Sequence, residues 1–406
     1  MPGKTWAFEM LTKVAHITVF PHTCRLPASF FLVPLFWVKI GRSKETMASL
    51  DIKRLVSQVK ANCDISDAKF WGTYSICGLL LRLREQFRKE TGVMPWQEIA
   101  KADIGSWISA REEVWREKEG DEYVPMSVCG REYSPFEVEK INESLEGNGI
   151  IYGAGLGINL KPSFFLARLV SQRVVEGHDT YVAGDEFVRD LSFYPAMLLN
   201  DAIFVRKDAM TTTLWEKFEE VGQRQHCGAL IYAFSVYGIS PEEKASEELY
   251  KNIQEISDRE VEAYIYHEVG ESLEGKRLGE QWKEILAQSR NRRVEFFLRG
   301  VKDILSDTSE SGMIRHMIEH DKRGSLGFYL SFLGGFRKAV FPEIQQAFTG
   351  FMETADWSLI EIARKSGYER AERLASRVLS IYASLDDKTA LDNVIEQDLI
   401  KTDFSV

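Results

Sequence analysis

EELYKNIQEISDREVEAYIYHEVGESLE, residues 247–274, predicts one long helix around which the rest of the chain is organised. The helix begins with an apolar stripe of residues at helical spacing, namely Leu249, Ile253 and Ile256. Continued at the same spacing, this stripe reaches Glu260, His267 and Glu271 instead of further aliphatic residues. Acidic and imidazole side chains therefore lie where core residues are expected, which is the best indication of function in the sequence.

The bulk composition is that of a globular protein with two or three domains. The chain has 406 residues, of which 44% are apolar and 28% are charged. A net charge of -10 argues against a general nucleic-acid binder or a binder of anionic membranes, because such proteins present a basic face. The five cysteines have no CxxC spacing, which predicts free thiols in a reducing cytoplasm.

Residues 1–46 differ in composition from the rest of the chain. They hold six basic and two acidic residues and one apolar run, Leu26 to Val38, which is too short to span a bilayer and contains two prolines. Our preferred interpretation is a translated leader upstream of a natural start at Met47. The alternative is a short anchor at a membrane surface.

From Met47 onward the patterns predict an α+β fold that is predominantly helical. Amphipathic segments over 47–122 predict a helical N-terminal unit. Strand-like runs over 123–207 predict a small antiparallel sheet with one or two helices. Almost unbroken helical periodicity over 208–386 predicts a large C-terminal helical bundle, and the polar residues 387–406 predict a loosely held tail.

Within the sheet region we expect two hairpins. The first pairs residues 164–175 with 180–182 across the turn at 176–179, and a short helix follows near 186–191. The second turns at Asn200-Asp201, between the apolar runs AMLL and AIFVR.

The glycine cluster Gly153 to Gly157 invites a dinucleotide-binding interpretation, which its spacing does not support. The third glycine of GxGxxG is replaced by Ile158, and Pro162 prevents a helix from following closely. We interpret the cluster as a glycine-rich turn that leads into a strand.

The histidines of the C-terminal region predict a metal site. His316 and His320 are four residues apart, so on a helix they share one face, and His267 and Glu271 repeat that spacing. Glu260 lies two turns before His267 on the same side. Two facing helices with such pairs can assemble a carboxylate–imidazole site for iron, manganese or zinc, with haem as a less favoured cofactor.

Two other interpretations of these residues stay open. The first is that Glu260, His267 and Glu271 form structural ion pairs with arginines of the same region, for which the candidates are Arg292, Arg293 and Arg315. The second is that His267 forms a general acid/base pair with Glu268 or Glu271. Neither the repeated Glu-x-x-His signature nor the two-histidine zinc protease motif is present.

Small residues recur within the aromatic segment 324–337, GSLGFYLSFLGGFR. Small residues weaken a helix, so they favour close packing against a neighbouring helix. The alternative is that they leave room for a flat ligand beside His320.

Four short motifs resemble an uncharacterised bacterial family of hypothetical proteins, many of them from anaerobes. They are NCDISDAK at 62–69, YSICGLLLRLR at 74–84, RDL at 189–191 and YHEVGE at 266–271. The resemblance extends over about 47–385 and supports Met47 as the start. It implies no activity, cofactor or catalytic residue.

The sequence therefore predicts a cytoplasmic protein with no membrane-spanning segment and no nucleic-acid partner. Its leading functional hypothesis is a metal bound through His267, His316 and His320 with Glu260 and Glu271. The rival hypothesis is a non-enzymatic interaction or scaffold protein whose acidic surface meets a protein partner or a second copy of the chain.

Overall fold

The computed structural model describes residues 50–157, 160–192, 194–199, 201–221 and 228–404. The predictions made for residues 1–46 lie outside these ranges. The described chain is α+β and predominantly helical, as the periodicity predicted, with strands confined to residues 126–206. No helix within the described ranges is long and apolar enough to cross a membrane.

Three helices open the described chain: α2 (Ile52–Phe70), α3 (Ile76–Thr91) and α4 (Lys101–Lys118). Short polar side chains cap the first two, because Asp51 accepts a hydrogen bond from the Arg54 amide and Ser75 accepts one from the Gly78 amide. Gly92, with a φ of 74°, ends α3 in the left-handed conformation that glycine tolerates best.

Two sheets follow. The strands β1 (Met126–Val128) and β2 (Arg131–Tyr133) form a short hairpin, and α5 (Val138–Leu145) leads to the main sheet. The main sheet has the order β3-β4-β5-β7-β6, with the strands β3 (Ile150–Leu156), β4 (Pro162–Val175), β5 (His178–Arg189), β6 (Ala196–Leu199) and β7 (Ala202–Arg206). All its pairings are antiparallel except that of β5 with β7, which is parallel.

Both predicted hairpins are present, but one local prediction is wrong and another is right only in part. No helix forms near residues 186–191, because β5 continues to Arg189 and pairs there with Phe165 of β4. Gly153 and Gly155 lie in strand β3 and not in a turn, whereas Gly157 follows the strand and exchanges backbone hydrogen bonds with Leu160 and Lys161 just before β4. A Cβ atom on Gly153 would lie 2.1 Å from the ring of Phe165, and one on Gly155 would lie 2.1 Å from Leu199, so these glycines make room for neighbouring side chains.

The rest of the chain is helical. Its helices are α6 (Lys207–Val221), α7 (Gly228–Val236), α8 (Glu247–Gln288), α9 (Arg292–Thr308), α10 (Met313–Glu319), α11 (Arg323–Phe332), α12 (Gly335–Val340), α13 (Glu343–Thr354) and α14 (Trp357–Ser384). The predicted long helix is α8, which runs 14 residues beyond Glu274 and contains a kink at Gly279, where φ is 76°.

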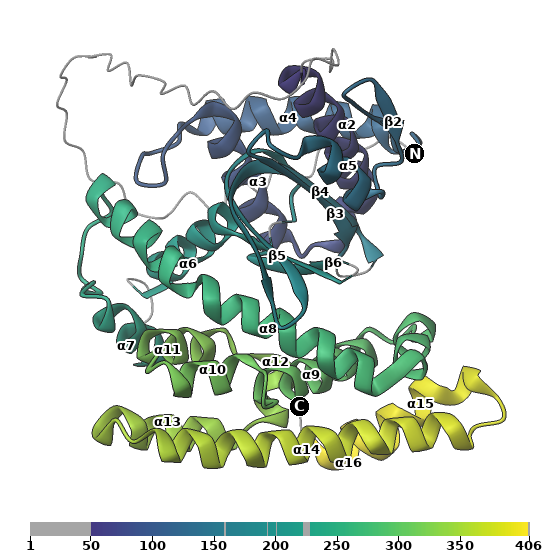
Figure 1. Cartoon of the computed structure of the whole chain (residues 1–406), viewed down its shortest axis with the longest axis vertical. Helices are drawn as coiled ribbons and strands as arrows, with labels where there is room; N and C mark the ends of the chain where they lie inside the picture. Colours follow the sequence, from purple (N-terminus) through teal and green to yellow (C-terminus); the bar gives the residue numbers. More distant parts are fainter. Residues whose placement is uncertain (1–49, 158–159, 193, 200, 222–227, 405–406) are drawn as a thin grey trace.

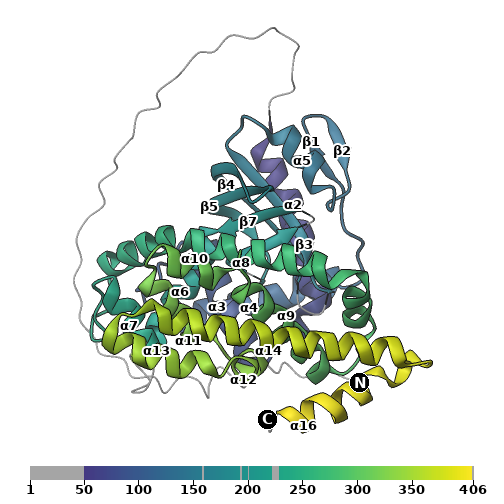
Figure 2. The same cartoon turned by 60° about the horizontal axis from the view of Figure 1, so that its bottom comes forward.

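Helix α8 lies between the sheet and the C-terminal helices (Figures 1 and 2). Its first half packs with α6, α7 and the sheet, through residues such as Leu249 and Ile253. Its second half packs with α9 and α14, through residues such as Trp282 and Ile285. The helix is therefore shared by two apolar cores, so its polar residues lie where the two cores meet.

The expectation of a loosely held tail is wrong for the described part of 387–406. This segment forms η3 (Lys388–Ala390), α15 (Leu391–Ile395), η4 (Glu396–Ile400) and α16 (Lys401–Asp403). Its apolar residues are buried in the same core as α9 and α14, and they are Leu391, Ile395, Leu399, Ile400 and Phe404. These apolar positions lie on one side of the segment, which its polar composition concealed.

Of the small residues of 324–337, Gly324 and Gly327 serve close packing, as expected, whereas a Cβ atom on Gly334 or Gly335 would meet nothing within 4 Å. A Cβ atom on Gly324 of α11 would lie 2.3 Å from the ring of Tyr237, and one on Gly327 would lie 2.9 Å from the Ala229 carbonyl oxygen of α7. Helices α7 and α11 therefore approach more closely than larger residues would allow.

Candidate functional site, a charged cluster between α8 and α9

Helix α8 lies close against α9 at Gly270. A Cβ atom there would lie 2.3 Å from the backbone oxygen of Ser306. This contact places three polar residues of α8 (His267, Glu268 and Glu271) beside three of α9 (Lys302, Asp303 and Asp307). Together with Arg337 of α12, these residues form a group that we call the α8–α9 cluster.

His267 and Asp307 make the inner contact of the cluster. The imidazole Nδ1 of His267 lies 2.6 Å from Oδ1 of Asp307, whose side chain is only 1% exposed. Burial alone would lower the pKa of His267, but the charge and hydrogen bond of Asp307, together with Glu268 and Glu271, raise it to about 10. His267 is therefore an imidazolium at neutral pH and has no lone pair to offer a metal.

Glu271, Lys302 and Asp303 form the outer part of the cluster. The Lys302 ammonium contacts the Glu271 carboxylate, and Nε of Arg337 lies 3.8 Å from Oδ2 of Asp303. Burial and then the charge of Glu271 raise the pKa of Asp303. The pKa of Glu271 is lowered in spite of burial, because Lys302, His267 and a hydrogen bond from Asp303 stabilise its charge. The Glu271 and Asp303 carboxyl groups are thus close neighbours.

Glu268 increases the negative charge of the cluster. It is 7% exposed, and burial, with a further contribution from Glu271, raises its pKa to about 7 in spite of the neighbouring His267. Four carboxyl groups therefore face three cationic groups, those of His267, Lys302 and Arg337. When every group is ionised, one negative charge is left without a counterpart.

Two further buried polar atoms of the cluster lie close to each other. They are Oδ2 of Asp307 and the hydroxyl of Tyr329 from α11, a residue that is 7% exposed. Burial, then the charge of Asp307 and a hydrogen bond between the two groups, raise the pKa of Tyr329. The Tyr329 hydroxyl and the Asp307 carboxylate are therefore partners of each other, and this contact ties α11 to the cluster.

Glu260 belongs to a different arrangement. Its carboxylate accepts hydrogen bonds from the hydroxyls of Tyr237 and of Ser325, the second at 2.9 Å. Burial raises the pKa of Glu260 in spite of these bonds. This carboxyl group ties α8 to α11 and to the residue that follows α7, which is a structural role.

His316 and His320 also lie apart from the α8–α9 cluster, in a stack of three rings. The ring centroid of His316 is 4.2 Å from that of Tyr266 and 4.2 Å from that of His320, with interplanar angles of 16° and 25°. Imidazole lone pairs lie in the ring plane, so two nearly parallel rings at this separation cannot both reach one ion at about 2 Å. Burial and then His320 lower the pKa of His316 to about 4.

The structure therefore does not bring the five predicted metal ligands together. Only His267 and Glu271 share the α8–α9 cluster. Throughout the ranges described above, no group of three or more His, Cys, Asp or Glu side chains is already arranged to hold a metal ion. The arginines proposed as structural partners contact other groups: Arg315 pairs with Glu319 and Glu361, and Arg293 pairs with Glu396.

The sequence contained a signal for the missing half of the cluster. Asp303 and Asp307 are four residues apart on an amphipathic helix, beside the core residues Ile304 and Leu305, and this spacing places both carboxylates on one side of α9. Arg337 and Tyr329 carry no comparable signal, because they reach the cluster from separate helices.

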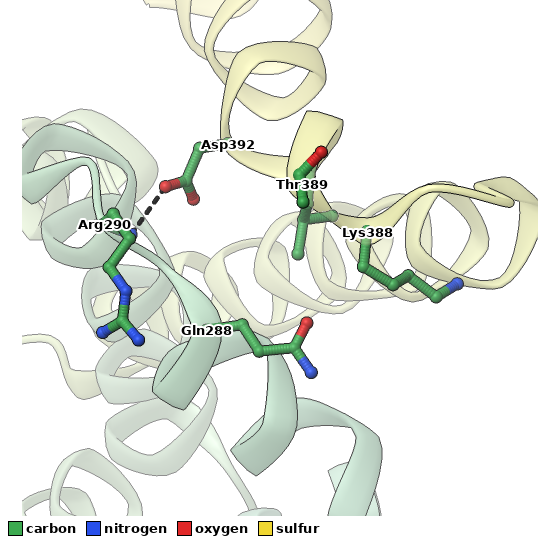
Figure 3. Close-up of a pocket in the computed structure, with 6 residues that line it drawn as sticks. Gln288, Arg290, Lys388, Thr389 and Asp392 are labelled. Carbon is green, nitrogen blue, oxygen red and sulfur yellow. Dashed lines mark hydrogen bonds between the residues drawn. The ribbon is translucent and has the colours of Figure 1, made fainter.

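Two surface pockets carry a weaker case for function. Figure 3 shows the first, of about 330 Å³, between the end of α8 and the start of α15. Its Asp392 accepts a hydrogen bond from the Arg290 amide, and its Lys388 ammonium binds the backbone carbonyls of Tyr382 and Leu385. The second, of about 410 Å³, lies between α8 and α14, where Arg364 is held by Glu361, Glu310 and the Thr308 carbonyl. In both pockets these charged groups are bound to other groups of the chain, so they stabilise the fold.

Comparison with known proteins gives a family and no activity. No curated protein and no solved structure matches the chain. Residues 54–206 match the N-terminal domain, and residues 211–401 the C-terminal domain, of a family of unknown function (DUF6866). The expected resemblance to an uncharacterised family is thereby confirmed, whereas an origin in bacteria or anaerobes stays a prediction. Since the two matches cover most of the sequence, the chain belongs to the DUF6866 family.

Proposed function

We propose that the protein binds a divalent cation, Mg²⁺ or Mn²⁺, between the carboxylates of Glu268, Glu271 and Asp303. The observation that carries the proposal is that these three acidic side chains come together from two helices, where Glu271 and Asp303 are partly exposed. The proposal keeps the metal-binding hypothesis of the sequence but changes the ligands.

Charge balance favours a divalent ion. The Lys302 side chain is 23% exposed and has a long flexible stem, so its ammonium can turn into solvent. The remaining groups would then be four carboxylates and two cations, which leaves two negative charges. A divalent cation neutralises this surplus. Since no three ligands already surround one point in the described chain, binding requires Lys302 to leave and the carboxylates to turn inward.

The ligand set decides which cation is expected. The three proposed ligands offer only oxygen atoms, which suit Mg²⁺ and Mn²⁺ better than zinc. His267 remains bound to Asp307 and acts as a charge partner of the carboxylates. Of the cations predicted from the sequence, manganese is retained.

Titration of the metal-free protein with Mn²⁺, followed by electron paramagnetic resonance, tests the proposal. We expect one site per chain and a loss of affinity of at least tenfold in Asp303→Asn and in Glu271→Gln. Lys302→Met should strengthen binding, because it removes the competing ammonium. His320→Ala and Glu319→Gln are matched controls outside the cluster and should bind like the parent protein. Absence of a site, or equal affinity in all variants, would overturn the proposal.

The scaffold role is the second candidate, and a specific observation favours it. Glu260, which the sequence placed in the same site, is fully engaged within the chain by Tyr237 and Ser325. If the α8–α9 cluster is equally structural, Asp303→Asn and Glu271→Gln will alter thermal stability while the protein binds no Mn²⁺.

A further inference from the structure

We draw no further inference here: the strongest candidate, the exposed edge of the main sheet at residues 171–174 of β4, which pair with β5 on one side and with no described strand on the other, carries none because nothing in the structure shows what covers it.

Discussion

Two clusters of charged side chains in this molecule have a similar composition, but they differ in how far they are exposed to solvent and in which groups bind their carboxylates. In the N-terminal region, the Lys161 ammonium lies 3.1 Å from Oδ1 of Asp67 and 3.2 Å from Oδ2 of Asp190. All three side chains are at most 7% exposed. Here too carboxylates outnumber cations, and burial followed by the charge of Asp190 raises the pKa of Asp67 in spite of Lys161.

The difference lies in the hydrogen bonds. Asp190 accepts from the Ser163 hydroxyl and from the Phe164 and Ser192 amides, and both oxygens of Asp67 accept from the Leu191 amide. These bonds join α2 to the start of β4 and the end of β5, so the N-terminal cluster is a closed structural clamp. The α8–α9 cluster is partly exposed, and the Glu271 carboxylate is bound there by the flexible side chain of Lys302. Clustered charges are therefore a better indication of function where a flexible, partly exposed side chain balances them than where backbone amides hold them in the interior.

Replacing the lysine of each cluster by methionine should give the largest contrast. Lys161→Met leaves two buried carboxylates without their cation and should cost about 3–5 kcal/mol of the free energy of unfolding. Lys302→Met removes a partly exposed ammonium and should cost less than about 1 kcal/mol. Urea denaturation of both variants measures the difference. Similar losses in the two variants would show that the α8–α9 cluster is a clamp as well.

A methyl group at the helix crossing should open the α8–α9 cluster. Gly270→Ala places a Cβ atom 2.3 Å from the Ser306 backbone oxygen, so α8 and α9 must separate, at a cost of about 1–3 kcal/mol. Gly275→Ala is the matched control, since its Cβ atom would lie 3.7 Å from Lys302 and alanine favours a helix. Thermal denaturation compares the two variants, and we expect Mn²⁺ binding to be lost only in Gly270→Ala. A stable Gly270→Ala protein that binds Mn²⁺ would contradict this account of the crossing.

The smallest effect concerns pH. The pKa of Glu268 is raised to about 7 in the folded chain, compared with about 4.3 in an unfolded one, so its contribution to stability is complete below pH 4 and is lost as the pH rises through 7. In the metal-free protein, Glu268→Gln should therefore reduce the loss of stability between pH 5 and pH 8 by roughly 1–2 kcal/mol. Denaturation midpoints at the two pH values test this expectation. An unchanged pH dependence would show that Glu268 does not contribute to the surplus charge.

Local sequence patterns predicted the elements of this fold well. The 3.6-residue periodicity identified α8 and the other long helices, and turn residues identified both hairpins. The wrong predictions arose where distant residues decide the structure. Gly153 and Gly155 suggested a turn, but they lie in a strand because Phe165 and Leu199 occupy the space beside them. The tail was expected to be loose because its composition is polar, yet a few apolar residues anchor it to the core.

The candidate site divides in the same way. The sequence by itself determined that His267 and Glu271 lie on the face of α8 that carries apolar core residues earlier in the helix. Helical spacing fixes which residues share a face. Only the tertiary structure decided which helix faces that stripe. The contact of Gly270 with Ser306 selects α9, and with it Asp303 and Asp307, while His316 and His320 are directed to Tyr266. Helix crossings depend on close packing between residues far apart in the chain. The spacing of residues along a single helix therefore does not predict which helix will cross it.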